Sequence, residues 1–297
     1  MKNIKKIIKI VLHYPINILI NIALIYSNIL SKFTKKLYFE DEVEKRERQS
    51  LTLKLDENIE LKFYILNSIT KFRAETFFNK EPDTIKWIKD YNGDGDLLDI
   101  GANVGIYSNY FAKLKKGHVY AFESSFYNLS LLSENCQLNK NENKITIYPL
   151  PLFENNNISY FKINHPIIGG ALSTFNVDYG FDGKKITDYK KYLIPGFSLD
   201  FLVENNIIRN VPSLIKIDVD GVEDLILKGS NKVLKNSLCR SVLVEVNEEF
   251  ESQYENIQKI MTDTGFNLYS TGKKTNLAVL KKSNKFKNTY NQIWFKN

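Results

Sequence analysis

The stretch Leu97-Leu98-Asp99-Ile100-Gly101-Ala102-Asn103-Val104-Gly105-Ile106-Tyr107-Ser108 decides the fold, because it predicts a buried strand, a glycine turn and the start of a helix. Gly101 and Gly105 let the backbone approach a ligand where a Cβ would clash, and the helix N-terminus presents free N–H groups. Asp99 aims a carboxylate into the turn, which repels a pyrophosphate and suits a cationic amino-acid or sulfonium ligand. The pattern therefore predicts S-adenosylmethionine as the cofactor.

Two other nucleotide-binding loops fit this stretch less well. A dinucleotide fingerprint reads G-x-G-x-x-G, and Asn103 occupies its middle glycine position, so the backbone cannot approach a pyrophosphate as closely. A P-loop reads G-x-x-x-x-G-K-[ST], and no lysine follows either glycine. NAD is therefore disfavoured, and ATP more strongly so. Taken alone, the stretch also fits an ordinary strand-turn-helix corner.

Two further predicted strands end in acidic residues. Glu123 ends the strand from His118, at a place where a carboxylate can accept hydrogen bonds from both hydroxyls of an adenosine ribose. Asp218 lies at the end of the apolar run Leu214 to Val219. Carboxyl ends of parallel strands meet at one sheet edge, so we expect Asp99, Glu123 and Asp218 in one crevice. Buried charges are costly without partners, which favours a functional role for these acids.

The rest of the chain predicts alternating strands and helices, and hence an α/β domain. Leu51 to Leu66 predicts a hairpin, and Ser68 to Tyr91 predicts helix with Pro82 at a helix start. The insertion from Leu150 to Gly196 contains the glycine-rich segment Ile167 to Ser173, which we expect to be a mobile loop. Further strands are predicted at Lys144 to Pro149, Ile158 to Ile163, Ser241 to Val246, Phe266 to Thr271 and Asn291 to Lys296.

The composition is that of a folded protein. A chain of 297 residues with 43% hydrophobic residues can bury a sizeable core. Cys136 and Cys239 fall inside predicted buried elements, so neither a disulfide framework nor a cysteine metal site is supported. A reducing compartment fits best, and we expect a cytoplasmic protein. Because lysine is abundant throughout, an isolated lysine carries little weight.

The positive charge is concentrated in the N-terminal tail. The chain carries a net charge of +7, and the first 36 residues alone contain seven lysines and no acidic residue. Residues 37–297 therefore balance at zero, so no basic field exists there to attract nucleic acid, and we expect no nucleic-acid partner. The seven lysines are Lys2, Lys5, Lys6, Lys9, Lys32, Lys35 and Lys36.

The tail also contains a long stretch without formal charge, from Ile10 to Ser31, about the length that spans a hydrocarbon core. Asn17, Asn21 and Asn28 fall on one helical face and leave isoleucine and leucine on the other. This pattern suits a helix in a membrane interface, with lysines meeting anionic headgroups. A helix packed on a partner and a true span stay open, whereas a signal peptide fits badly because no A-x-A-like site follows.

Four motifs, in order and spacing, resemble the FkbM-type methyltransferases. The similarity covers residues 81–246 closely and the C-terminal strands loosely, and it excludes the tail before residue 50. The motifs are Leu98-Asp99-Ile100-Gly101-Ala102-Asn103-Val104-Gly105, Ala121-Phe122-Glu123, Asn135 to Asn139, and Ile215-Lys216-Ile217-Asp218-Val219-Asp220-Gly221 with Glu223.

The resemblance implies a Rossmann-like class I methyltransferase fold, which is an α/β fold with a doubly wound, mostly parallel seven-stranded sheet, here with an N-terminal helical extension. It implies S-adenosylmethionine dependence and, most often, methylation of hydroxyl oxygens on natural products, sugars or surface polysaccharides. The family pattern departs at Ser124, where proline is usual, and at Asp220, where glutamate is usual. The implied cofactor-binding residues are Asp99, Gly101 and Gly105 at the methionine end and Glu123 at the ribose, and we add Asn103 and Ser124.

Methyl transfer to oxygen is an in-line displacement, so the protein chiefly aligns the acceptor, the methyl group and the sulfur. A base that accepts the hydroxyl proton helps, and our candidates are Asp218, then Glu245 at a strand end, then His165 in the insertion. Each has a structural alternative: Asp218 as a residue that orients cofactor or backbone, Glu245 as a solvated strand end, and His165 as a loop residue. No ligand spacing demands a metal, and we predict none.

We therefore expect residues 1–40 to form a basic amphipathic helix, residues 41–95 a helix and hairpin lead-in, and residues 96–297 the methyltransferase domain. The predicted partners are a small-molecule or glycan acceptor and, through residues 1–36, a membrane surface on its cytoplasmic face. A non-catalytic methyltransferase-fold module that docks a membrane glycan-biosynthesis complex is one alternative. An RNA methyltransferase is another, disfavoured because no N-P-P-Y-type motif follows Asp218. The oligomeric state stays open.

Overall fold

The computed structural model describes residues 2–45, 48–272 and 288–296. The chain divides into two compact units, Met1–Arg48 and Gln49–Asn297. The first unit consists of helix α1, Lys2–Thr34, and helix α2, Tyr38–Lys45. The buried Ser27 hydroxyl joins them, because it donates to Glu40 at 3.2 Å and accepts from the Phe39 backbone N–H at 3.0 Å.

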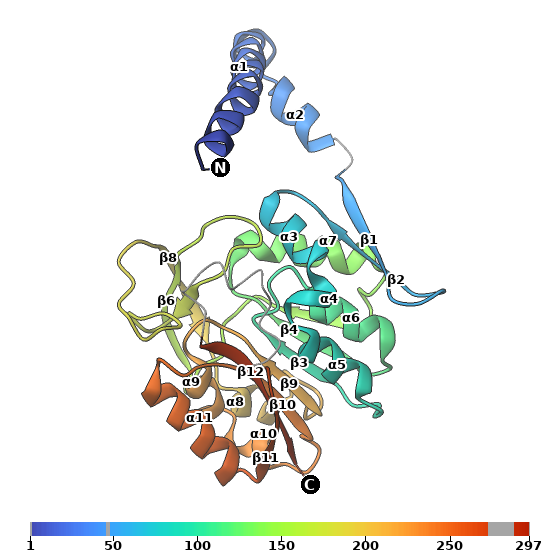
Figure 1. The fold of residues 1–297 in the computed structure, drawn as a ribbon, viewed down its shortest axis with the longest axis vertical. Helices are drawn as coiled ribbons and strands as arrows, with labels where there is room; N and C mark the ends of the chain where they lie inside the picture. The colour runs from blue at the N-terminus through green and yellow to red at the C-terminus, as the bar shows by residue number, and fades with distance from the viewer. Residues whose placement is uncertain (1, 46–47, 273–287, 297) are drawn as a thin grey trace. The chain divides into compact units, whose positions relative to one another are not determined.

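A seven-stranded sheet forms the centre of the second unit, in the order β11-β12-β10-β9-β3-β4-β5 (Figure 1). Neighbouring strands pair in parallel except for β12, which runs antiparallel to both β10 and β11. This confirms the predicted doubly wound, mostly parallel sheet. The strands are β3 (Leu97–Ile100), β4 (Val119–Phe122), β5 (Ile145–Tyr148), β9 (Leu214–Ile217), β10 (Ser241–Asn247), β11 (Phe266–Thr271) and β12 (Thr289–Lys296).

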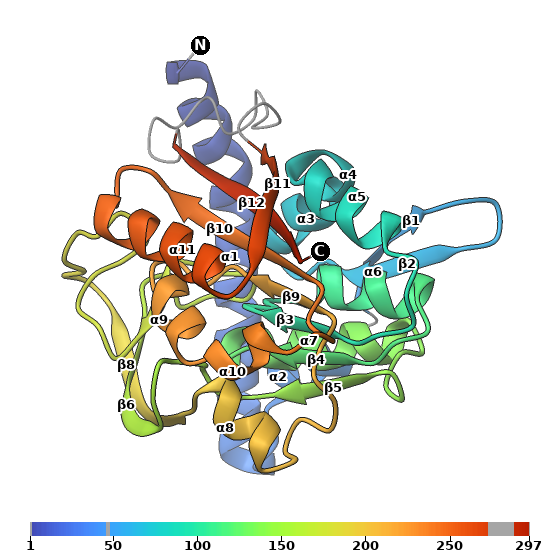
Figure 2. The same cartoon turned by 90° about the horizontal axis from the view of Figure 1, so that it is seen from below.

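Helices cover both faces of this sheet, as Figure 2 shows. On one face lie α5 (Pro82–Asp90), α6 (Ile106–Leu114) and α7 (Phe126–Leu138), which pack against strand residues such as Leu97 and Ala121. On the other face lie α8 (Leu199–Glu204), α9 (Glu223–Lys228), α10 (Asn231–Lys235) and α11 (Glu251–Asp263), against Leu98 and Ile215. Alternate residues of each strand therefore face opposite sides of the sheet and pack in two different hydrophobic cores, which explains why the central strands are continuous apolar runs.

Residues 49–96, which precede the first strand of the central sheet, belong to the second unit. Strands β1 (Ser50–Lys54) and β2 (Glu60–Tyr64) form the predicted antiparallel hairpin. Two asparagines of α7 and its C-cap bind the free edge of β2: Asn135 Oδ1 accepts from Tyr64 N at 3.0 Å, and Asn139 Oδ1 accepts from Lys62 N at 2.8 Å. Asn135 also donates to the Val104 carbonyl at 2.9 Å, so it links the hairpin to the glycine turn.

Three helices occupy the segment predicted as helical. They are α3 (Ser68–Glu75), α4 (Phe77–Lys80) and α5. The break before α5 has a local cause, because Glu81 has φ −136° and ψ 67° and precedes Pro82, whose ring disfavours helical backbone at the residue before it. Pro82 opens α5, as predicted.

The insertion forms a separate three-stranded antiparallel sheet in the order β7-β6-β8. Its strands are β6 (Asn157–Ile163), β7 (Ser173–Phe175) and β8 (Lys190–Gly196). Buried aromatic residues of this sheet, Phe161 and Phe175, belong to the same core as Phe122 of β4. The insertion is therefore packed onto the main sheet and closes one side of the crevice described below.

Strand order reverses between β3 and β9, and the turns that follow these strands touch. Gly101 has φ +82°, and a Cβ added there would lie 1.9 Å from the Asp218 carbonyl oxygen. Only glycine therefore fits at this position. In open α/β sheets this reversal point at the carboxyl ends of the strands is where ligands bind.

We predict that Gly101→Ala lowers the free energy of unfolding by about 3 kcal/mol, because strained left-handed backbone and a collision with rigid backbone both contribute. Gly265→Ala is the matched control, since Gly265 has φ +86° but a Cβ there meets nothing within 4 Å. It should cost about 1 kcal/mol. Urea unfolding measures both variants, and equal losses would show that crowding at Asp218 is unimportant.

Candidate active site

Two adjoining cavities open at the carboxyl ends of β3, β4 and β9. The smaller, of about 80 Å³, is lined by Glu123, Ser124 and residues of the insertion. The larger, of about 340 Å³, extends toward α3, α4 and β12. Both are lined by Gly101, Asn103, Gly170, Ala171, Asp218 and Asp220. A ligand longer than the smaller cavity can therefore continue into the larger one past these shared residues.

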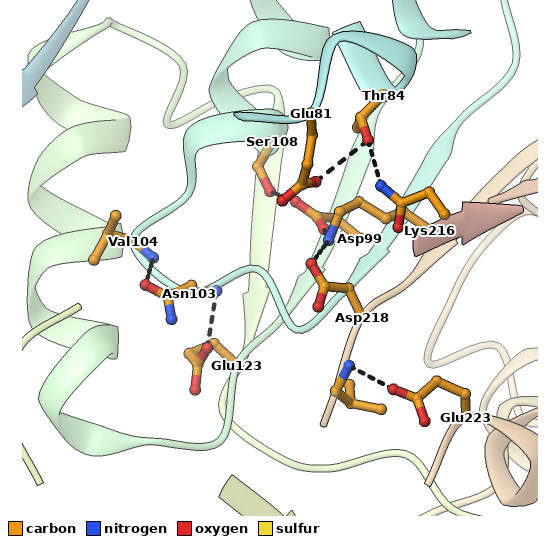
Figure 3. Close-up of polar contacts among 12 residues, drawn as sticks. Glu81, Thr84, Asp99, Asn103, Val104, Ser108, Glu123, Lys216, Asp218 and Glu223 are labelled. Atoms are coloured by element: carbon orange, nitrogen blue, oxygen red, sulfur yellow. Dashed lines mark hydrogen bonds and ion pairs between the residues drawn. The ribbon is translucent and has the colours of Figure 1, made fainter. Parts of the chain in front are cut away.

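Glu123 is buried at the end of β4 and faces the smaller cavity. Each of its carboxylate oxygens accepts one backbone hydrogen bond. Oε2 accepts from Asn103 N at 2.8 Å (Figure 3), and Oε1 accepts from Ser125 N at 2.6 Å. Burial raises the pKa of Glu123 to about 7 despite these two bonds. Carboxylate oxygens have further lone pairs, so Glu123 retains the capacity to accept hydrogen bonds from a ligand.

The loop after His165 is held by side chains from four directions, although the sequence led us to expect a mobile loop. Its backbone groups from Ile168 to Leu172 form six hydrogen bonds of 2.6–3.2 Å with side chains. Gly170 and Ala171 line both cavities, so this loop is a shared wall. The partners are Asn67 and Arg73 of the α3 region, Asn103 of the glycine turn, Asn128 of α7, and Asp220.

Asp99 lies inside β3 and is fully buried, and neither cavity is lined by it. Its Oδ2 accepts from the Ser108 hydroxyl at 2.6 Å, and its Oδ1 lies 3.5 Å from Lys216 Nζ, an ion pair without a hydrogen bond. The side chain thus points into the interior between the sheet and α6, where it contacts the start of that helix.

Lys216 is the cation that joins the predicted acids. Its side chain is 2% exposed, and its Nζ lies 3.1 Å from Asp218 Oδ2 as well as 3.5 Å from Asp99 (Figure 3). Burial alone would lower the pKa of Lys216, but Asp218, Asp99 and Glu81 together raise it above its ordinary value. The lysine is therefore charged, and it forms ion pairs with the two carboxylates beside it.

The three candidate bases, Asp218, Glu245 and His165, all line the larger cavity. Their environments differ. Burial, followed by the charges of Asp218 and Asp220, raises the pKa of Glu245 well above its ordinary value, which favours its protonated form. His165 is exposed on the loop. Of the three, Asp218 alone lines both cavities, and its carboxylate forms an ion pair with Lys216.

Several residues that line the larger cavity were not identified from the sequence. Lys80 and Glu81 form an ion pair at 2.6 Å. Burial favours the neutral form of Glu81, but Lys80 and Lys216 lower its pKa to about 2. Arg73 and Tyr107 also line this cavity. The position of Lys216 within the apolar run Ile215-Lys216-Ile217 was the available signal, because a lysine in a central strand needs a buried partner.

The two remaining predicted cofactor residues are placed differently. Ser124 lines the smaller cavity beside Glu123. Gly105 lines neither cavity, and a Cβ there would lie 2.4 Å from Leu132 Cδ1, so its glycine allows α6 to pack on α7. Within residues 2–45, 48–272 and 288–296, no group of three or more histidines, cysteines or acids is arranged to hold a metal ion.

A family model for the methyltransferase FkbM domain matches residues 99–268, which is more than half of the chain. The chain belongs to the FkbM methyltransferase family. No match was found among curated proteins. S-adenosylmethionine is the cofactor of this family, and the strand order of the central sheet is that of class I methyltransferases.

Solved structures of methyltransferases resemble the chain at low identity. The FkbM methyltransferase from Methylobacillus flagellatus KT is 15% identical, with a TM-score of 0.41, and the match covers 68% of this chain and 43% of that one. Magnesium protoporphyrin IX methyltransferase from Synechocystis PCC 6803, with bound SAM, is 14% identical, with a TM-score of 0.44 and coverage of 78% and 86%. The fibrillarin pre-rRNA processing protein of Methanococcus jannaschii is 14% identical, with a TM-score of 0.43 and coverage of 85% of both chains.

The residues present fit the family's cofactor. Glu123 is a buried carboxylate with unused acceptor capacity in the smaller cavity, which suits the paired hydroxyls of a ribose. Asp218 and Asp220 at the junction of the cavities provide negative charge where a sulfonium cation would lie. Gly101 keeps the floor of that junction free of a side chain. The two cavities, which share the residues at their junction, therefore have the charge and the hydrogen-bonding groups that this cofactor requires.

Proposed function

We propose that this chain transfers the methyl group of S-adenosylmethionine to a hydroxyl of a sugar or a similar polyhydroxylated molecule, with a surface-polysaccharide precursor as the favoured acceptor class. The observation that carries the proposal is the larger cavity, which adjoins the cofactor cavity and is rich in hydrogen-bonding groups. An acceptor with many hydroxyls can pair with such groups, whereas an apolar acceptor would leave them unsatisfied. Its polar lining includes Arg73, Lys80, Glu81, His165, Asp218, Asp220, Glu245 and Asn291.

Besides aligning the reactants, the side chains must accept the proton of the acceptor hydroxyl. The acceptor oxygen forms a bond to the methyl carbon while the carbon–sulfur bond breaks, and the hydroxyl proton must then leave the oxygen. Asp218 is the base that we assign to this proton, because it lines both cavities and its carboxylate forms an ion pair with Lys216. Glu245, whose raised pKa favours the protonated form, is suited in that form to donate a hydrogen bond to an acceptor oxygen.

We predict that Asp218→Asn lowers kcat for methyl transfer by about a hundredfold to ten-thousandfold, because the acceptor proton loses its base. Binding of S-adenosylhomocysteine should weaken far less than kcat falls, because its sulfur is uncharged and its ammonium still faces Asp220 and Glu245. The assay follows transfer of a labelled methyl group to glycan precursors. Asp94→Asn is the control, since Asp94 lies on the surface and its side chain is 76% exposed. Full turnover by Asp218→Asn would remove Asp218 as the base, and cofactor binding without turnover on any acceptor would favour the non-catalytic docking module.

We also propose that α1 lies on an anionic membrane surface. One stretch of the described chain, Tyr14–Thr34, is long and apolar enough to cross a membrane by length and composition. Within the first unit, α1 packs against α2 through the face that contains Ser27. The opposite face presents an exposed apolar stripe, which, together with the seven lysines and the absence of acids in the first 36 residues, supports an interfacial position. The stripe consists of Ile18, Leu19, Ile22, Ile25, Tyr26, Ile29 and Phe33.

Vesicle sedimentation tests this surface in the full chain. Ile22→Asp with Ile29→Asp should lower the fraction bound to anionic vesicles at least about tenfold, because it places charge in the apolar stripe. Asn21→Asp with Asn28→Asp adds the same charge on a polar face and should retain most of the binding. Equal losses in both variants would mean that charge alone attracts the tail, and an unbound wild-type protein would contradict the membrane proposal.

A further inference from the structure

The larger cavity is lined by three cationic side chains of lysine or arginine, and two of them have carboxylate partners. Lys80 pairs with Glu81, and Lys216 pairs with Asp99 and Asp218. Arg73 differs, because its Nε donates to the Gly169 carbonyl at 2.9 Å and, within the described part of the chain, it forms no ion pair. A guanidinium has five N–H donors, so four are free to bind an anion in the cavity.

A short series of contacts links Arg73 to the carboxylate that suits the ribose. Arg73 donates to the Gly169 carbonyl. The carbonyl of the next residue, Gly170, accepts from Asn103 Nδ2 at 2.8 Å, and the backbone N–H of Asn103 donates to Glu123. The positive charge of Arg73 is close enough to Glu123 to oppose the rise in its pKa that burial causes. Arg73 therefore lies beside the junction where a ligand passes from the smaller cavity into the larger one.

Charge is unevenly distributed around that junction. Asp218, Asp220 and Glu245 belong to the β9 and β10 side of the larger cavity, whereas Arg73 approaches from α3. The methionine end of the cofactor carries both a cationic sulfonium and ammonium and an anionic carboxylate. The acidic side attracts the cations and repels the carboxylate, which then finds a donor on the α3 side. The cavity thus favours one orientation of this zwitterion.

We infer that Arg73 binds the α-carboxylate of the methionine end of S-adenosylmethionine through charge-assisted hydrogen bonds. This inference rests on the cofactor of the proposed function and does not depend on the acceptor. The Nε bond to Gly169 fixes the guanidinium plane and leaves the Nη groups for the carboxylate. Because the same bond holds the shared wall of the cavities, Arg73 connects cofactor binding to the loop from His165 to Leu172.

Calorimetric titration with two ligands tests this assignment without any acceptor. S-adenosylhomocysteine and 5′-methylthioadenosine share the adenosine and the thioether sulfur, but only the first carries the carboxylate. Arg73→Gln should weaken S-adenosylhomocysteine about tenfold to a hundredfold and leave 5′-methylthioadenosine within about twofold of the wild type. Retained binding of the smaller ligand also shows that the variant is folded. Lys71→Gln removes an exposed charge from the same helix, outside both cavities, and should change neither affinity.

Three results would overturn the inference. Unchanged S-adenosylhomocysteine binding by Arg73→Gln would mean that the arginine serves another anion, such as a charged group of the acceptor. Equal weakening of both ligands would mean that Arg73 acts only by holding Gly169. Wild-type protein that binds neither ligand would refute this inference and the cofactor assignment together. A selective loss in Arg73→Gln, in a protein that methylates no acceptor, would support the inference and count against the proposed function alone.

Discussion

A lysine ammonium buried between two carboxylates is the interaction on which the site depends. Lys216 of β9 stands opposite Asp99 of β3 in the strand register, and its Nζ reaches Asp218 beyond the end of its own strand. Each of these charges would be costly to bury alone, so they are stable only as a group. Tyr107 and Ser108 at the start of α6 complete the group, through a ring 5.3 Å from Nζ and a hydroxyl bonded to Asp99.

This arrangement divides the acids by role. Asp99 lines neither cavity, and it positions Lys216 through their ion pair. Asp218, with a side chain that is 25% exposed, presents its carboxylate to both cavities. Glu123 serves the smaller cavity from the neighbouring strand. Gly101, in the turn after β3, lies so close to the Asp218 carbonyl that a Cβ does not fit between them, and this contact fixes the distance between the loops after β3 and β9. The loop from His165 to Leu172 then closes both cavities from the insertion side.

Much of the fold could be predicted from the sequence, because its signals are local. The turn after β3, the hairpin and the apolar runs of β9 and β10 each follow from a few neighbouring residues. The grouping of Glu123 and Asp218 at one edge followed from the rule that parallel strands share their carboxyl ends. The burial of Asp99 could not be read in the same way, because it depends on the strand register that places Asp99 against Lys216.

The side of the site that α3, α4 and α5 form could not be predicted from the sequence either. Arg73, Lys80 and Glu81 belong to a segment that we expected only as a lead-in, and their role depends on where these helices pack. The abundance of lysine further concealed Lys216, since nothing local distinguishes a buried lysine from a solvated one except its apolar neighbours. The hydrogen bonds that hold the His165 loop come from residues far apart in the chain, so its glycine content alone suggested mobility.

A double-mutant cycle on Lys216 and Asp99 tests the central claim most directly, with the free energy of unfolding as the readout. Lys216→Met alone should cost about 3–5 kcal/mol, because it leaves buried carboxylates without their cation. In the presence of Asp99→Asn the same substitution should cost at least about 1 kcal/mol less, since one of those carboxylates is gone. Additive losses, within about 0.5 kcal/mol, would contradict the account and show that Lys216 and Asp99 do not stabilise one another.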